Sequence, residues 1–273
     1  MQSGAGCAGG RVNSSAYGKL VLMAPKPRSA EYFDGWYADK AASQLVTEIQ
    51  NRHLGLPPDA LAGVVAAEGI DEIAEELRLK PGDVLLDLAC GRGWYGLEIA
   101  GRTGARLIGV DFSAEAVRQA REQARLRNRE AQFRTGELTA SGLPGGSVNA
   151  VLCTDSIQFP DDPDTAYREL RRVLAPGGRA VLTGWEPVVV GDERLSERMR
   201  RVDVGAGLRA AGFTEVEVRD RPRWRARELA LWQEAAALDP GVDPALRSFH
   251  DEAVRSLETF GALRRVIAAA TAP

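Results

Sequence analysis

The sequence contains little cysteine and histidine, which excludes several kinds of site. Its 273 residues include three cysteines, Cys7, Cys90 and Cys153, which are widely spaced and form no Cys-x-x-Cys pair. An odd number at this spacing argues against a disulfide framework and against a zinc site. The chain has two histidines, His53 and His250, so a catalytic histidine would have to be one of them. We therefore expect no metal centre.

Long apolar runs and a strong net charge are also absent. No apolar run approaches the length of a membrane span, and residues 20–24 are too short for the core of a signal peptide. The net charge is −3 and the pI about 5.6, whereas nucleic-acid-binding domains are usually strongly basic. With 44% hydrophobic and 27% charged residues, the composition is typical of a globular protein. We expect a cytoplasmic protein that binds neither a membrane nor nucleic acid.

Composition and periodicity divide the chain into four parts. Residues 1–28 are rich in Gly, Ser and Ala and are expected to form a mobile tail. Residues 29–80 show helical periodicity and predict an N-terminal helical cap, with its second helix at about 71–79. Residues 81–222 and 264–273 form the predicted core. Between these two pieces, residues 223–263 predict two helices broken around 239–241, placed as a helical lid before the last strand.

The core alternates strand and helix patterns, which predicts an α/β fold with a doubly wound, mostly parallel sheet. Ser113 is positioned to cap one helix, and Asp162 followed by Pro163 begins another. Pro176-Gly177-Gly178 predicts a turn before the fifth strand. The predicted strands start at Val84 and then cover 107–111, 132–135, 147–154, 179–183, 214–219 and 265–270.

One stretch organises the core. The apolar run that begins at Val84 ends in Asp87 and leads into Gly91, Gly93 and Gly96, typical of a buried strand, a tight turn and a helix start. A second short strand ends in Asp111, where an acid can accept bonds from both ribose hydroxyls. The glycines also match the Gly-x-Gly-x-x-Gly pattern of dinucleotide binders. An acid at position 87 pointing at the loop would repel a pyrophosphate, so we favour a nucleoside ligand carrying an ammonium and a sulfonium.

Four motifs resemble those of the class I S-adenosylmethionine-dependent methyltransferases of the small-molecule branch. The resemblance covers about residues 70–220 and the final strand. It implies a Rossmann-like sheet of seven strands with the last strand antiparallel. The motifs are Asp87-Leu88-Ala89-Cys90-Gly91-Arg92-Gly93, Gly109-Val110-Asp111-Phe112-Ser113, Gly136-Glu137-Leu138 with Leu143-Pro144, and Leu174-Ala175-Pro176-Gly177-Gly178-Arg179.

The resemblance implies a role for each matching residue in binding S-adenosylmethionine. Two of the expected residues do not match the family's motifs. Glu137 stands where the family usually has Asp, and Tyr37 is included because its ring could face the sulfonium. The expected cofactor-binding residues are Asp87, Ala89, Gly91, Gly93 and Thr154 for the methionine part, Asp111 for the ribose, Phe112, Gly136, Glu137 and Leu138 for the adenine, and Tyr37.

The methyl acceptor and the catalytic group are less well defined. Many relatives carry a histidine shortly after the fourth strand, but here Gln158 or Phe159 occupies that place, and neither is a base. His53, His250 and Asp155 are candidate bases, each with an ordinary structural alternative. Trp36, Gln158, Trp224 and Trp232 are candidate substrate-binding residues, although the two lid tryptophans could simply attach the lid to the core. The arginines between 219 and 227 either bind an acidic group or form a solvated edge with acidic partners.

We therefore predict methyl transfer from S-adenosylmethionine to an oxygen or nitrogen of a small, natural-product-like molecule. One alternative is a protein that keeps the fold and the cofactor pocket but transfers no methyl group, acting as a rearrangement catalyst or a binding module. A second is an NAD(P)-dependent oxidoreductase. The sequence leaves a homodimer open.

Overall fold

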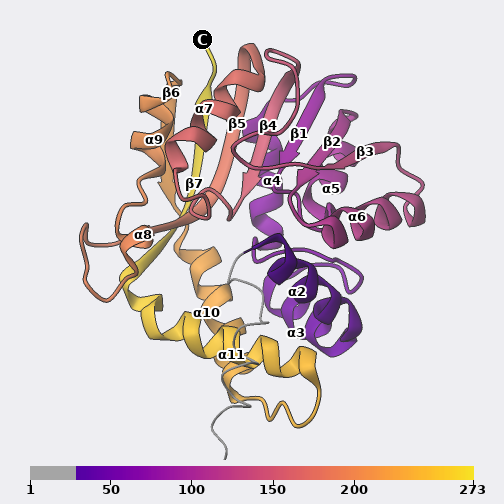
Figure 1. The fold of residues 1–273 in the computed structure, drawn as a ribbon, viewed down its shortest axis with the longest axis vertical. Coiled ribbons are helices and arrows are strands. Elements are labelled where there is room, and N and C mark those ends of the chain that lie inside the picture. Colours follow the sequence, from indigo (N-terminus) through magenta and orange to yellow (C-terminus); the bar gives the residue numbers. More distant parts are fainter. Residues whose placement is uncertain (1–28) are drawn as a thin grey trace, which may run out of the picture.

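Seven strands form one sheet at the centre of the molecule. The computed structural model describes residues 29–273, so the predicted tail at 1–28 lies outside the described residues. The strand order is β3-β2-β1-β4-β5-β7-β6, and only β7 runs antiparallel to its neighbours, as the resemblance implied (Figure 1). The strands are β1 (Val84–Leu88), β2 (Arg106–Asp111), β3 (Ala131–Thr135), β4 (Val148–Thr154), β5 (Leu174–Pro187), β6 (Thr214–Asp220) and β7 (Leu263–Thr271).

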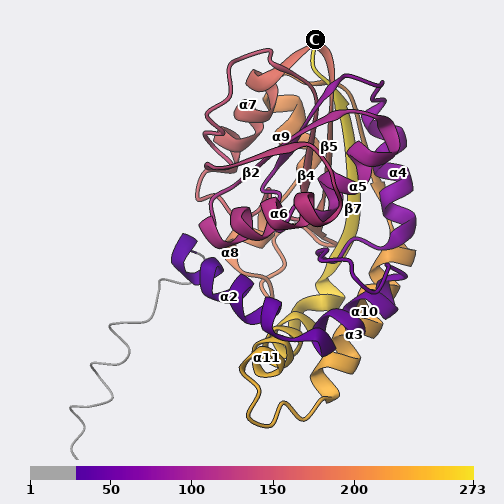
Figure 2. The ribbon, with the colours of Figure 1, turned by 90° about the vertical axis from the view of Figure 1, so that its right-hand side faces the viewer.

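Helices cover both faces of the sheet. Along β1 and β4, successive side chains enter different cores, because neighbouring residues of a strand point to opposite faces: Leu85 and Leu152 belong to one core, Leu86 and Val151 to the other. The first core includes α4 (Ala67–Leu77), α5 (Trp94–Thr103) and α6 (Ala114–Leu126), and the second α7 (Pro163–Val173) and α9 (Val204–Ala210). Figure 2 shows α4 and α5 on one side of the sheet, with α7 and α9 on the other.

The helix starts follow the predicted capping chemistry. Ser113 Oγ accepts the N–H of Ala116 at the start of α6, and Asp162 accepts the N–H of Asp164 at the start of α7, where Pro163 is the first helical residue. One helix boundary was wrong: α4 begins at Ala67, four residues before the predicted start. Gly69 in its first turn lies against Trp224, and glycine has a low helix propensity, which weakens the sequence signal for the helix start.

The predicted turn at Pro176-Gly177-Gly178 was also wrong. β5 already begins at Leu174, which pairs with Val148, and the pairing with β4 then resumes at Arg179. The intervening residues form an irregularity in the strand and bond to the end of the chain: Gly177 N–H donates to the Ala272 carbonyl at 2.7 Å, and Ala272 N–H donates to the Gly178 carbonyl at 2.8 Å. Backbone pairing with the C-terminal residues therefore replaces a free turn.

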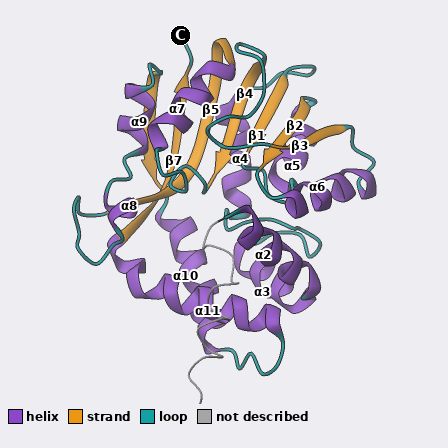
Figure 3. Ribbon diagram, viewed as in Figure 1, coloured by secondary structure: helices purple, strands orange, loops and turns teal. Residues whose placement is uncertain are grey.

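Helices from both ends of the chain meet at the carboxyl ends of the parallel strands (Figures 1 and 3). They are α2 (Ala30–Ala42), α3 (Gln44–Leu54), α10 (Pro222–Ala237) and α11 (Pro244–Thr259), the last two separated at the predicted break. Helix α10 packs against α11 and α3, while α11 also contacts α2. The short elements α8 (Glu197–Arg200) and η1 (Phe260–Ala262) complete the chain. Among the described helices, none is long and apolar enough to span a bilayer.

Arginines of β6 and of the segment that follows it have acidic partners. Arg219 pairs with Glu76, Arg221 with Glu72 and Arg227 with Glu68. The three glutamates lie one helical turn apart on α4, so the arginines attach α10 and β6 to that helix. Of the two interpretations left open by the sequence, the structure favours an edge with acidic partners.

Candidate functional site

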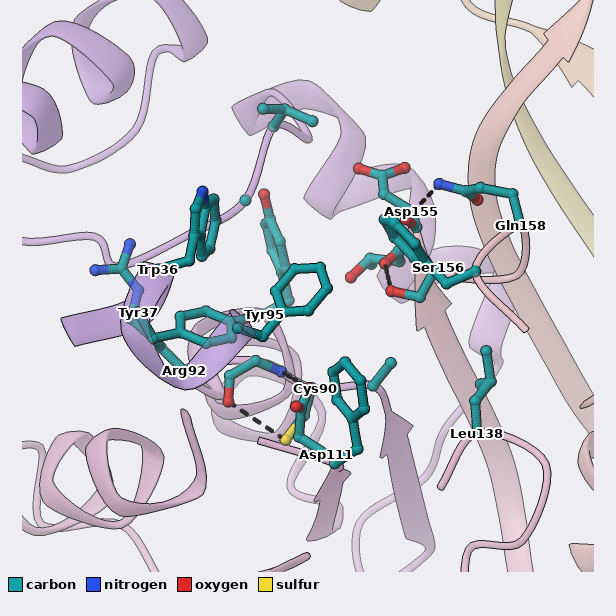
Figure 4. Close-up of a pocket in the computed structure, with 18 of the residues that line it drawn as sticks. Trp36, Tyr37, Cys90, Arg92, Tyr95, Asp111, Leu138, Asp155, Ser156 and Gln158 are labelled. Carbon is teal, nitrogen blue, oxygen red and sulfur yellow. Dashed lines mark hydrogen bonds between the residues drawn. The ribbon is translucent and has the colours of Figure 1, made fainter. Parts of the chain in front are cut away.

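A cavity of about 790 Å³ lies between the carboxyl ends of the strands and helices α2, α10 and α11. Loops that follow β1, β2, β3 and β4 form one side, and residues of α2, α10 and α11 form the other. In open α/β sheets, ligands bind at this edge. Figure 4 shows Trp36, Tyr37 and Arg92 on one side of the cavity and Asp155 and Gln158 on the opposite side.

The loop after β1 is held in a tight conformation beside Asp111. Gly91 and Gly93 have positive φ angles of 52° and 75°, and Ala89 adopts 64°, which is uncommon for a residue with a Cβ. A Cβ on Gly91 would lie 2.7 Å from the Tyr37 hydroxyl. Gly91 N–H donates to Asp111 Oδ2 at 2.7 Å. Glycine is therefore required where α2 and this loop approach each other closely.

Asp87 lies beneath the loop and does not line the cavity. Its side chain is 1% exposed, and its Oδ2 accepts the N–H of Gly96 in the first turn of α5 at 3.1 Å. Burial raises the pKa of the Asp87 carboxyl to about 7. The structure therefore places this acid at the helix start, and the expectation that it points at the ligand is not met. Gly93 likewise packs away from the cavity, against Phe133.

The expected nucleoside end of the cavity is built from β2, β3 and α2. Asp111, Phe112 and the predicted residues Gly136, Glu137 and Leu138 all line it. Asp111 also accepts the Ser113 N–H at 2.9 Å, and burial raises the pKa of its carboxyl to about 6. Phe33 of α2 lies 5.3 Å from the Phe112 ring, centroid to centroid. An acidic side chain beside two aromatic rings suits a ribose joined to a planar base.

Helix α2 contacts the expected nucleoside end of the cavity through one acidic side chain. Asp34 Oδ1 accepts the hydroxyl of Ser113 and the N–H of Glu115 at 3.1 Å, both at the start of α6. This contact brings Trp36 and Tyr37 to the cavity wall; that they bind a ligand stays a prediction.

At the other end, the candidate base Asp155 is held in an ion pair. Arg265 of β7 donates to both of its carboxylate oxygens, one of them at 2.7 Å, and the Thr183 hydroxyl donates to it at 2.8 Å. The Arg265 side chain is fully buried. Gln158 Nε2 donates to the Asp155 backbone carbonyl at 2.7 Å. Thr154, Asp155 and Gln158 line the cavity, but the last two also hold the loop after β4.

The two histidines lie outside the cavity lining. His53 Nε2 contacts Glu234 at 2.6 Å between α3 and α10, and His250 contacts the neighbouring Asp251 at 3.1 Å. Trp224 packs against Gly69 of α4, whereas Trp232 reaches the cavity. The structure therefore does not bring the candidate bases together.

Sequence reasoning missed Glu228, a buried acid at the lid end. It is 3% exposed, lines the cavity and accepts the Trp232 indole N–H at 3.2 Å, while its Oε2 makes no hydrogen bond and lies 3.6 Å from Arg265 Nε. Burial raises the pKa of Glu228 to about 8. The sequence pattern that could have identified Glu228 is its position midway between Trp224 and Trp232, four residues from each.

Among residues 29–273, no group of acids, cysteines and histidines could hold a metal ion.

Comparisons with known proteins agree with this geometry. A family model described as a methyltransferase domain matches residues 85–178, the segment that contains β1 to β4 and the start of β5. Over this segment the chain is similar to methyltransferase domains.

Curated relatives of this chain are named for different methyl acceptors. Phosphoethanolamine N-methyltransferase 1 of Arabidopsis thaliana is 27% identical over 58% of this chain and 35% of its own length. The 27-O-demethylrifamycin SV methyltransferase of Amycolatopsis mediterranei is 28% identical over 64% of this chain and 72% of its own. The chain spans less than half the length of the plant enzyme. These relatives therefore agree with the family-model match and do not fix an acceptor.

Solved structures of other proteins share the fold of this chain. The [4+2]-cyclase SpnF superimposes with a TM-score of 0.66 and 25% identity, covering 86% of this chain and 94% of its own. Phosphoethanolamine N-methyltransferase 2 of Haemonchus contortus, solved with S-adenosyl-L-methionine, gives a TM-score of 0.68 at 18% identity over 85% of this chain and 57% of its own.

Proposed function

We propose that this protein transfers a methyl group from S-adenosylmethionine to an oxygen or nitrogen of a small, natural-product-like molecule. The observation that carries the proposal is the hydrogen bond of Asp111 to Gly91, which places the ribose-type acid against the loop after β1 in a cavity closed by α2, α10 and α11. We also propose that it acts in the cytoplasm on small molecules rather than nucleic acid.

The cavity residues fit this cofactor. Asp111 would bind the ribose hydroxyls, Phe112 would lie against the adenine, and Glu137 with the Leu138 backbone would bind the edge of the base. The loop from Ala89 to Gly91 would lie beside the methionine part. Two features support the fit: only glycine leaves space at position 91, and Arg92 presents a buried donor without a partner.

The lid end of the cavity would hold the acceptor. Trp185 and Trp232 provide apolar walls, and Glu228 provides a carboxyl with a pKa of about 8, which can accept a proton once it is ionised, as the pH approaches that value. The cofactor supplies an activated methyl group; the chain aligns the acceptor atom with it, excludes water and accepts the acceptor's proton. We propose residues 223–263 as the lid that closes over both ligands.

The test is incubation with methyl-labelled S-adenosylmethionine and a fractionated metabolite extract. We expect label in an organic product with the wild-type chain and none with Asp111→Asn. Cofactor binding without labelled product in any fraction would contradict methyl transfer.

A second candidate function follows from the likeness to SpnF, a [4+2]-cyclase. Neither histidine lines the cavity, and Asp155 is engaged by Arg265, so proton removal depends on Glu228 alone among the candidates considered. A cavity of this kind would also suit a reaction in which the protein holds the substrate in a reactive conformation and no general base is needed. Conversion of a substrate with unchanged S-adenosylmethionine would favour this second function.

A further inference from the structure

Three buried side-chain oxygens at the lid end of the cavity receive no hydrogen bond from the described part of the chain. They are Glu228 Oε2 on α10, Glu252 Oε2 on α11 and Gln158 Oε1 in the loop after β4. Glu228 is the most enclosed of the three residues and is 3% exposed. The Gln158 amide is oriented by its Nε2, which donates to the Asp155 carbonyl at 2.7 Å and leaves the oxygen free. Because a buried acceptor without a donor is costly, a ligand that supplies donors here would be favoured.

The same end of the cavity carries more negative than positive charge. Arg265 is fully buried and donates to both carboxylate oxygens of Asp155, so these two residues balance each other. Its remaining donor, Nε, lies 3.6 Å from Glu228 Oε2 and makes no hydrogen bond. No ion pair within residues 29–273 involves Glu252. Glu228 and Glu252 are therefore left with one cation, which Asp155 already engages.

The walls beside these acids are aromatic. Trp185 of β5 and Trp232 of α10 line the cavity, and the Trp232 indole N–H donates to Glu228 Oε1 at 3.2 Å, which holds the ring next to the acid. Aromatic ring faces attract cations and also provide apolar surface. Of the described residues that line the cavity, Arg92 is the only basic one, and Figure 4 shows it on the opposite side from Asp155. The lid end thus combines unpaired acceptors, negative charge and aromatic surface.

These features distinguish between the polar groups that a ligand can carry. A carboxylate or a phosphate brings negative charge and would be repelled by Glu228 and Glu252. A hydroxyl brings one donor together with further acceptors, whereas an ammonium brings three donors, no acceptor and a positive charge. Hydrogen bonds between an ammonium and carboxylates are also charge-assisted and stronger than those of a neutral hydroxyl. An ammonium therefore matches the lid end best.

We propose that the methyl acceptor carries a basic amine on an apolar body, and that this amine binds as an ammonium ion to Glu228, Glu252 and the Gln158 amide oxygen. This inference rests on the proposed function, because it takes the lid end of the cavity as the acceptor site. Burial raises the pKa of Glu228 to about 8, so this carboxyl is mostly protonated in the empty cavity at pH 7. Binding of the ammonium should therefore be accompanied by ionisation of Glu228.

The test compares three probes of similar shape, added to the chain saturated with S-adenosylhomocysteine. At pH 7 benzylamine is a cation, benzyl alcohol is neutral and benzoate is an anion. Titration followed by tryptophan fluorescence should show benzylamine binding at least about tenfold more tightly than benzyl alcohol, as expected for hydrogen bonds to charged groups, and no binding of benzoate.

The pH dependence of the same titration identifies the group that ionises. Between pH 7 and pH 8 the benzylamine affinity should rise by about fivefold, which is the increase in the ionised fraction of a carboxyl with a pKa of about 8. Asp155, Glu252 and Arg265 are the charged groups that face Glu228, and none of them replaces it in this range. Glu228→Gln should therefore remove the rise, and benzyl alcohol should show none with either protein.

Two substitutions on α11 locate the preference for the amine. Glu252→Gln keeps the shape of the side chain and removes its charge, so benzylamine should bind about tenfold more weakly and benzyl alcohol should change by less than about twofold. Glu258→Gln makes the same change of charge at an exposed position of α11 outside the cavity lining, and should alter neither affinity. Both variants should retain the wild-type melting temperature and S-adenosylhomocysteine affinity, which shows that the fold and the cofactor site are intact.

Several results would overturn the proposal. They are equal binding of benzylamine and benzyl alcohol, binding of neither probe, or equal weakening of both by Glu252→Gln. Tighter binding of benzoate than of benzylamine would assign an anionic acceptor and would overturn it as well. Binding of S-adenosylhomocysteine by the wild-type chain is measured before any probe is added. Its absence would contradict the proposed function itself, which is a different result.

Discussion

Asp111 and Gly91 are joined by a hydrogen bond of 2.7 Å, so the acid that ends β2 and the loop that follows β1 form one unit. The same carboxylate accepts the Ser113 N–H at the start of α6. One side chain thus fixes the two loops between which the proposed nucleoside would lie.

Asp111→Asn should weaken S-adenosylhomocysteine binding by at least about tenfold, because the amide retains one acceptor where the carboxylate offers two. Titration calorimetry measures the effect. Wild-type affinity should also fall below about pH 6, where the carboxyl becomes protonated, whereas the variant should lose this dependence. If the two proteins bound S-adenosylhomocysteine with equal affinity at pH 8, Asp111 would not be the residue that binds the ribose.

The ion pair of the fully buried Arg265 with the partly buried Asp155 should be important for stability. Arg265→Met leaves the partly buried Asp155 without its cation, and we expect the free energy of unfolding to fall by up to about 3–5 kcal/mol. Urea denaturation measures this change. Arg102→Met removes a half-exposed pair with Asp71 and should cost less than about 1 kcal/mol. Similar losses for both variants would show that burial of the pair does not decide its contribution.

Glu228 gives stability a characteristic pH dependence. Its pKa is about 8 in the folded state against an ordinary value of 4.5, so the folded protein retains the proton over this interval. The stabilising contribution of the protonated Glu228 carboxyl to the free energy of unfolding is present below about pH 4.5 and is lost as the pH rises through 8. We therefore expect the melting temperature of Glu228→Gln, relative to the wild type, to rise between pH 5 and pH 9. A difference independent of pH would contradict the buried, protonated acid.

Two glycines provide a matched test of packing. A Cβ at Gly69 would lie 2.7 Å from Val65 and 2.8 Å from the Trp224 ring, whereas at Gly101 it would meet the mobile end of Arg129. Gly69→Ala should lower the free energy of unfolding by about 1–3 kcal/mol through overpacking. Gly101→Ala should be neutral or raise it by up to about 1 kcal/mol through helix propensity. Thermal unfolding distinguishes them; a stabilised Gly69→Ala protein would mean that α4 and α10 do not pack as described.

The strands and the order of helices could be predicted from sequence because their signals are local. The apolar run of β4, the caps at Ser113 and Asp162 and the break between α10 and α11 each lie within a few residues. The site depends on contacts distant in sequence. Arg265 lies 110 residues from Asp155, and no local pattern reveals that this pair occupies the candidate base. Likewise, sequence placed Asp87 at the correct strand end but gave no sign that Gly96 takes its carboxylate.

The central claim is that this cavity binds S-adenosylmethionine and not a dinucleotide. Calorimetric titration of the wild-type chain with S-adenosylhomocysteine and, separately, with NADH tests it most directly. We predict saturable binding of S-adenosylhomocysteine, one molecule per chain, and no measurable binding of NADH. Saturable binding of NADH without binding of S-adenosylhomocysteine would contradict it.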